Sequence, residues 1–217
     1  MHRITYAIVR NHTMQSAALL KMNSMANSEM RMPEHIETIF LDRDGVLNEK
    51  MPEEHYVTSW DEFRTLQGIA EAISKLNRAG IRVIVVSNQR GIALGRMTST
   101  AVEAIHARFQ NFLKASGAHI DAFYFCPHDK DECDCRKPKP GLFQQAMRDF
   151  PAIQPETSIL IGDSLSDIQA GRNFEMATVW ISGDEKSRRP EWVKAHQLAN
   201  ATFASLPDAI EALIPRK

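Results

Sequence analysis

The chain carries the stretch IETIFLDRDGVLN at residues 36–48, an apolar run that ends in two aspartates. The apolar residues 36–41 predict a β-strand, in which alternate side chains share one face. Asp42 and Asp44 therefore leave this strand pointing the same way, and Gly45 frees the backbone to turn sharply. Two carboxylates at a strand end can divide labour, one as nucleophile or metal ligand and the other as proton carrier. A simple strand-ending turn also favours Asp and Gly, so this interpretation needs support from the rest of the chain.

Length and composition indicate one globular domain, with at most a tail in addition. Of the 217 residues, 43% are hydrophobic and 24% are charged, which is ordinary for a folded domain. A formal net charge of −1 shows no excess of positive charge that would indicate binding to nucleic acid or to an anionic membrane. No apolar run approaches the roughly 18 residues that span a bilayer. All three cysteines lie between Cys126 and Cys135, unlike a secreted disulfide framework. We expect a cytoplasmic protein that is a monomer.

The N-terminal residues differ in composition from the rest. Residues 1–28 contain no Asp or Glu and only scattered basic residues. This segment lacks the apolar core and cleavage site of a secretory signal, although an acid-poor stretch is also compatible with a transit peptide. We expect residues 1–33 to be a poorly ordered extension, or the product of an upstream start codon that precedes a more natural one near Met30 or Met32. Residues 34–217 are expected to form the domain.

From residue 34 onward, short β-branched runs alternate with helical patterns. The predicted strands are residues 36–41, 81–87, 122–125, 158–161 and 177–181. The predicted helices are residues 68–79, 98–116, 141–150, 166–173 and 206–214. This alternation predicts an α/β fold, a three-layer αβα Rossmann-like parallel sheet with helices on both faces, and no second domain.

Unusual residue clusters follow four of these strands at their carboxyl ends. They are Asp42/Asp44, Ser87-Asn88, Cys126-Pro127-His128 and Gly162-Asp163. Ligands of open α/β sheets bind beyond the carboxyl ends of the strands. Turn chemistry could explain each cluster singly, but their convergence on one edge favours a shared site.

The cluster after the fourth strand suggests a hard metal ion. Asp163 would add an oxygen ligand to those of Asp42 and the backbone carbonyl of Asp44, leaving room for waters and a phosphate around Mg²⁺. Asp167 is equally compatible with a carboxylate favoured at the start of a helix. The hydroxyl of Ser87 and the N–H groups after it can hold phosphate oxygens, although a Ser/Asn turn is an equal alternative.

Residues 126–135 have the spacing C-x-H-x4-C-x-C. Three thiolates and one imidazole, from Cys126, His128, Cys133 and Cys135, can close a tetrahedral Zn²⁺ site. Three unrelated free cysteines are the alternative, but their confinement to one short window favours metal. A closed ligand set implies a structural zinc that staples a polar loop.

Basic residues follow the last of these ligands directly. Anchoring Cys135 would fix where Arg136 and Lys137 project. A lysine ammonium suits a transferring phosphoryl group, and an arginine fork suits a second phosphate or a sugar oxygen. For Lys139 a solvated basic loop is the preferred interpretation.

Together, these motifs resemble the haloacid dehalogenase superfamily of phosphotransferases. They are residues 42–48, Ser-Asn-Gln at 87–89, Lys137 and Gly-Asp-x-x-x-Asp at 162–167, in the family's order within residues 36–182. The zinc loop is similar to that of a capless branch, with at most a minimal cap, whose members act on D-glycero-D-manno-heptose 1,7-bisphosphate or on histidinol phosphate.

Features of the chain point to both substrates of that branch. Asn-Gln-x-Gly-Ile-x-x-Gly at residues 88–95 and the Tyr56-Val57 segment are more similar to the heptose enzyme. The four residues between His128 and Cys133 make a loop shorter than in well-known heptose enzymes and similar to the histidinol type.

The resemblance implies a mechanism and a partner. The partner is a phosphorylated small molecule, hydrolysed with Mg²⁺ through an aspartyl-phosphate on Asp42, while Asp44, protonated at first, serves as acid and then as base. Ser87 and Lys137 would stabilise the phosphoryl oxygens. The implied substrate-binding residues are Gly45, Asn48, Asn88, Gln89 and Arg136.

Two further functions share parts of this pattern. A polynucleotide 3′-phosphatase has the same motifs, but the near-neutral charge argues against it. A catalytically silent, zinc-stabilised binding module would not need Asp42, Asp44, Lys137 and Asp163 together.

Overall fold

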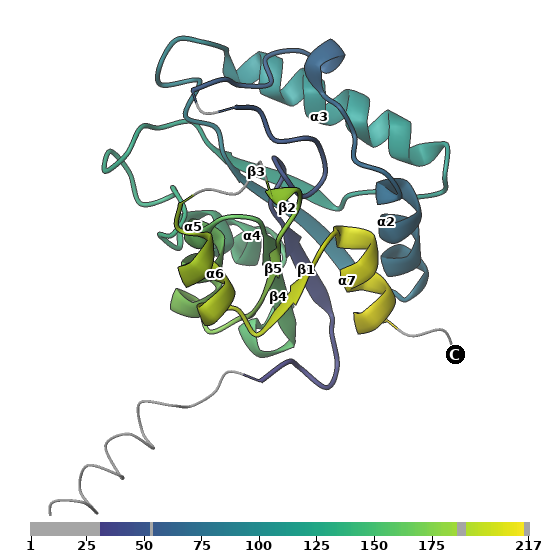
Figure 1. Ribbon diagram of the computed structural model, residues 1–217. Helices are drawn as coiled ribbons and strands as arrows, with labels where there is room; N and C mark the ends of the chain where they lie inside the picture. The colour runs from purple at the N-terminus through teal and green to yellow at the C-terminus, as the bar shows by residue number, and fades with distance from the viewer. Residues whose placement is uncertain (1–30, 53, 186–189, 215–217) are drawn as a thin grey trace, which may run out of the picture. The chain divides into compact units, whose positions relative to one another are not determined.

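The computed structural model describes residues 31–52, 54–185 and 190–214, and its centre is a six-stranded parallel sheet with the order β3-β2-β1-β4-β5-β6 (Figure 1). The strands are β1 (Thr38–Leu41), β2 (Arg82–Asn88), β3 (Ala122–Cys126), β4 (Ser158–Gly162), β5 (Ala177–Ile181) and β6 (Ala201–Phe203). The helices are α2 (Ile69–Arg78), α3 (Ser99–Lys114), α4 (Gly141–Asp149), α5 (Leu165–Asn173), α6 (Trp192–Leu198) and α7 (Leu206–Leu213), with 3-10 turns η1 (Trp60–Glu62) and η2 (Pro155–Thr157).

Alternate residues of β1 build two separate cores, one on each face of the sheet. Ile39 and Leu41 belong to a buried cluster shared with α2, α3 and α7. Phe40 belongs to a second cluster shared with α4 and α5. The central strand is buried on both faces, as its apolar run requires of a parallel sheet. The predicted three-layer αβα fold is confirmed.

All five predicted strands and all five predicted helices are present, but one strand and one helix of the described residues were missed. β6 has three residues and α6 has seven, so neither is long enough to show a clear hydrophobic period. The sequence left the function of residues 183–197 open, and α6 begins within them and ends one residue beyond, at Leu198. Within the described residues, the chain from Arg31 onward forms one compact unit without a separate cap domain, and none of its helices could cross a membrane. The predicted extension, residues 1–33, lies outside the described residues up to residue 30 and stays a prediction.

Candidate active site

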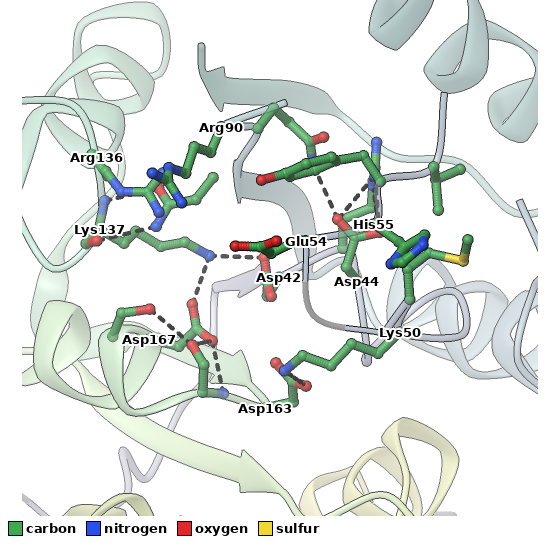
Figure 2. A pocket seen from close by; sticks show the side chains of 18 of the residues that line it. Asp42, Asp44, Lys50, Glu54, His55, Arg90, Arg136, Lys137, Asp163 and Asp167 are labelled. Atoms are coloured by element: carbon green, nitrogen blue, oxygen red, sulfur yellow. Dashed lines mark hydrogen bonds and ion pairs between the residues drawn. The ribbon is translucent and has the colours of Figure 1, made fainter. Parts of the chain in front are cut away.

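A cavity of about 360 Å³ opens at the carboxyl edge of the sheet. Its lining includes seven of the residues predicted for the site: Asp42, Asp44, Asn88, Gln89, Arg136, Lys137 and Asp163. Three of the strand-end clusters thus contribute to one cavity although they are far apart in sequence, because parallel strands bring their carboxyl ends to one edge. Figure 2 shows the side chains that line this cavity.

Asp42 stands at the centre of the site, one residue beyond β1. Its backbone N–H donates to the Ile161 carbonyl at 2.9 Å, which ties it to β4. Its carboxylate accepts a hydrogen bond from Lys137 Nζ at 2.9 Å (Figure 2). Burial, together with the nearby charge of Asp167, raises the pKa of Asp42 to about 7 despite Lys137. The site therefore favours a cation beside this carboxyl group.

Lys137 is a buried cation, only 3% exposed. Its ammonium group donates to the Val86 carbonyl at 2.7 Å and pairs with Asp167 at 2.6 Å as well as with Asp42. Burial alone would lower the pKa of Lys137, but the two carboxylates raise it, so the group stays charged. Asn88 fixes its backbone, since the Asn88 amide donates to the Lys137 carbonyl at 3.1 Å and accepts from the Lys137 N–H at 3.0 Å.

Three carboxyl groups gather at one side of the cavity. Asp42, Asp163 and Asp167 each offer an oxygen atom, and these atoms lie within 4.8 Å of one another. Carboxylate oxygens this close are suited to one hard divalent cation. Lys50 forms an ion pair with Asp163 (Figure 2). Asp167 also caps α5, because its carboxylate accepts a hydrogen bond from the Ser164 N–H at 3.0 Å.

Asp44 lines the cavity, and polar side chains surround its carboxylate. Its carboxylate accepts hydrogen bonds from Arg43 at 2.9 Å, from Asn48 at 2.9 Å and from Gln89 at 3.1 Å. Burial works against the charged form, but Arg43 and these hydrogen bonds hold the pKa of Asp44 below its usual value. The carboxyl group is therefore ionised in this arrangement, which differs from the expected initial protonation.

Three residues predicted to contact the substrate are not among those that line the cavity. Ser87 is 1% exposed and its hydroxyl accepts a hydrogen bond from Gln89 at 3.3 Å. Asn48 is fully buried behind Asp44. Gly45 serves a close approach instead, because a Cβ atom there would lie 2.2 Å from Asp163 Oδ2. These three residues therefore contact the residues that line the cavity and do not line it themselves.

Sequence reasoning missed much of the cavity rim. The additional lining residues are Arg43, Lys50, Met51, Pro52, Glu54, His55, Tyr56, Val57, Arg90, Lys130, Ser164 and Ser166, together with Asp167, whose function the sequence had left open. Lys50 meets Asp163 across 113 positions of sequence, which no local pattern reveals. The Tyr56-Val57 segment and the run that contains Arg90 were noted, but only as family resemblances.

The four predicted zinc ligands converge beside β3. Distances between Sγ atoms are 3.5 Å for Cys126–Cys133 and 3.3 Å for Cys133–Cys135, while His128 Nδ1 lies 3.8 Å from Cys126 Sγ and 3.3 Å from Cys135 Sγ. Bonds of about 2.0–2.3 Å to a tetrahedral zinc would place its ligand atoms roughly 3.3–3.8 Å apart. The donor set and its spacing fit a closed Zn²⁺ site.

Comparison with known proteins agrees with the fold and with the family resemblance. Residues 37–206 match the family model described as "Polynucleotide kinase 3 phosphatase". The chain is 41% identical over 173 residues to the D-glycero-alpha-D-manno-heptose-1,7-bisphosphate 7-phosphatase of Mycobacterium bovis, covering 79% of this chain and 88% of that protein. It is 33% identical over 188 residues to the D-glycero-beta-D-manno-heptose-1,7-bisphosphate 7-phosphatase of Escherichia coli K12, covering 83% and 96%.

A solved structure extends this likeness to the fold. The D,D-heptose 1,7-bisphosphate phosphatase of B. bronchiseptica, complexed with magnesium and phosphate, superposes with a TM-score of 0.72 and 30% identity over 82% of this chain and 98% of that one. The chain therefore belongs to the polynucleotide kinase 3 phosphatase family, within the haloacid dehalogenase superfamily of phosphatases.

Proposed function

We propose that this protein is a Mg²⁺-dependent phosphatase that removes the 7-phosphate of D-glycero-D-manno-heptose 1,7-bisphosphate through an aspartyl-phosphate on Asp42. One observation carries the chemistry: Asp42 lies 2.9 Å from the Lys137 ammonium, with Asp163 and Asp167 beside it, in one cavity. The names of the Mycobacterium bovis and Escherichia coli relatives support the choice of substrate.

The proposed reaction has two steps. A carboxylate oxygen of Asp42 attacks phosphorus, the bond from phosphorus to the sugar oxygen breaks, and Asp44 gives that oxygen a proton. A water molecule then attacks the aspartyl-phosphate and returns a proton to Asp44, which releases phosphate and frees Asp42. Lys137, and Ser87 if Gln89 moves aside, would stabilise the phosphoryl oxygens.

Asp44 must gain a proton before the first step. Its pKa is low because Arg43 faces it, yet a doubly negative phosphoryl group in the cavity would raise the pKa by repulsion. We therefore propose that binding of the substrate, rather than the protein alone, protonates Asp44.

Two metal sites fit the donor atoms. Asp42, the backbone oxygen of Asp44 and Asp163 would hold Mg²⁺, which offsets the repulsion between the attacking carboxylate and the phosphoryl group. Cys126, His128, Cys133 and Cys135 would hold a structural Zn²⁺. The loop that they close leads directly into Arg136 and Lys137, so the zinc would position both.

The cavity favours a small doubly phosphorylated substrate. Its volume of about 360 Å³ lies at the lower end of small-molecule sites. Besides Lys137 it is lined by Lys50, Arg90, Lys130 and Arg136, enough positive charge for a second phosphate group. The short zinc loop favours histidinol phosphate as the second candidate. We propose that the protein is a monomer and acts on no nucleic acid.

Steady-state phosphate release with Mg²⁺ tests the proposal. The substrates are both anomers of the heptose bisphosphate, histidinol phosphate, a 3′-phosphorylated oligonucleotide and an aryl phosphate. We expect kcat/KM to be at least about a hundredfold higher for a heptose bisphosphate than for the others, because a site built for two charged groups loses binding energy when one is missing. A preference for histidinol phosphate would replace the substrate assignment, and no release from any compound would refute catalysis.

A further inference from the structure

The indole of Trp180 contacts the backbone of a proposed magnesium ligand. Gly162 of β4 pairs with Trp180 of β5, and Asp163 follows one residue beyond that last pair. Trp180 Nε1 donates a hydrogen bond to the Asp163 carbonyl at 3.0 Å. A backbone carbonyl just past the end of a ladder needs a partner, and here a side chain of the neighbouring strand supplies it.

The surroundings of Trp180 hold its indole in one orientation. The side chain is 2% exposed and belongs to a small core with Ile168 of α5 and Ala195 of α6. Trp192 of α6 stacks on it with a centroid distance of 6.1 Å and an interplanar angle of 14°, and His196 lies 5.8 Å away. The donor N–H is therefore aimed at the Asp163 carbonyl by packing on both sides.

The position of this carbonyl bears on the metal site. The carboxylate of Asp163 must stay close to that of Asp42 for one ion to bind both, and their oxygen atoms lie within 4.8 Å. Fixing the carbonyl fixes the peptide that precedes Ser164, and with it the direction in which the Asp163 side chain leaves the chain. A ligand held in place before binding loses less conformational freedom when the ion arrives.

We infer that Trp180 is a positioning residue for magnesium: its indole N–H, held by α6, keeps Asp163 in the orientation that binds the ion. This inference rests on the proposed function, which makes Asp163 a magnesium ligand. It also assigns a function to the segment 183–197, because Trp192 of α6 stacks on the Trp180 indole. Simple core packing is the competing explanation, and the two differ in what removal of the N–H alone would do.

Isothermal titration of the whole protein with MgCl₂ separates them. Trp180→Phe removes the donor and keeps an aromatic ring, whereas Trp192→Phe trims the stacked partner and leaves the hydrogen bond. We expect Trp180→Phe to raise the Mg²⁺ dissociation constant about threefold to tenfold, the usual worth of one hydrogen bond, and Trp192→Phe to change it less than about twofold. In turnover assays, Trp180→Phe should raise the Mg²⁺ concentration for half-maximal rate but approach the original kcat at saturating Mg²⁺.

Several outcomes overturn the inference. Unchanged Mg²⁺ affinity in Trp180→Phe would do so, and so would an equal loss in both variants, because packing would then explain the effect. If Trp180→Phe does not fold, 3-benzothienylalanine at position 180 keeps the shape without the N–H and decides the matter by the same titration. If the unmodified protein does not bind Mg²⁺, the metal site of the proposed function is itself refuted. If the unmodified protein binds Mg²⁺ and Trp180→Phe binds it equally well, only the positioning role of Trp180 is refuted.

Discussion

At the scale of single residues, the site depends on charges that are buried together. Asp42, Asp163 and Asp167 would repel one another strongly without compensation, and Lys137 offsets part of this charge from within hydrogen-bond distance of two of them. Burial raises the pKa of Asp42, and the remaining negative charge of Asp167 and Asp163 adds to this effect. Such an arrangement costs folding free energy and is retained for function.

The first prediction concerns the nucleophile. Asp42→Asn should lower kcat at least about a thousandfold, because an amide does not form the covalent intermediate. A raised pKa means that ionised Asp42 destabilises the fold above neutral pH, so in EDTA at pH 8 the variant should melt at the same temperature or higher. Phosphate release and thermal unfolding measure both effects. Substantial activity in a pure sample would exclude Asp42 as the nucleophile.

The second prediction concerns the turn after β1. Gly45 has φ of 94°, and a Cβ atom there would meet Asp163, whereas Gly80 has φ of 74° with nothing within 4 Å of an added Cβ. Gly80→Ala should cost about 1 kcal/mol of unfolding free energy from backbone strain alone. Gly45→Ala should cost at least about 2 kcal/mol and should weaken Mg²⁺ binding, because Asp163 must move.

Urea unfolding and magnesium titration of both glycine variants measure this difference. Equal losses of stability, with Mg²⁺ affinity unchanged in both, would show that the close approach of Gly45 to Asp163 is unimportant.

At the scale of elements, the loop between β3 and α4 is joined to the end of β2. The Asn88 amide pairs with the Lys137 backbone, and Arg90 forms an ion pair with Asp129. Lys139 Nζ donates to the Cys133 carbonyl at 2.7 Å, within the loop itself. The proposed zinc site thus lies in the same loop as Lys137, so the position of this loop sets the position of the lysine.

The third prediction follows from this connection. Cys133→Ser should lower zinc affinity at least about tenfold and should lower both the melting temperature and kcat, because the loop that carries Arg136 and Lys137 loses its staple. Asp134→Asn is the control, since its side chain is 98% exposed and it lies between two ligands. Metal content, thermal unfolding and turnover give the result. A Cys133→Ser protein with unchanged zinc and melting temperature would contradict the structural zinc.

At the scale of the whole molecule, stability should depend on pH through His106. This side chain of α3 is 5% exposed, stacks on Phe123 at 4.5 Å and has no hydrogen-bond partner for Nε2 among the described residues. Burial, reinforced by the charge of Arg43, lowers the pKa of His106 to about 3. The folded protein therefore keeps His106 neutral where the unfolded chain takes up a proton.

The fourth prediction is a change in the pH dependence of unfolding. The contribution of His106 is complete above pH about 6.5 and is lost at about 1.4 kcal/mol per pH unit as the pH falls toward 3. His106→Phe should remove this slope, so urea unfolding at pH 7.5 and 5.5 should show a smaller loss on acidification, by about 1 kcal/mol, than in the parent chain. Equal losses in the two proteins would show that His106 is not buried in the neutral form.

Much of this architecture follows from local sequence. Residues 38–41 of the apolar run are buried on both faces of the sheet because they alternate between two cores, and Gly45 allows the turn that follows because glycine tolerates a positive φ. The convergence of the four proposed zinc ligands was predictable because they lie within ten consecutive residues, 126–135, where spacing alone limits their geometry. Chemistry that is local in sequence is predictable from sequence.

Contacts between distant segments were decided only by the tertiary structure. The ion pair of Lys50 with Asp163, the hydrogen bond from Gln89 to Asp44 and the hydrogen bond from Trp180 to Asp163 each join segments that neither periodicity nor spacing relates. Sequence fixes which groups stand at the ends of strands, since the period of a strand is local. Which of them are buried, paired or exposed depends on the order of strands in the sheet, because that order places β4, with Asp163 and Asp167 beyond its end, beside Asp42.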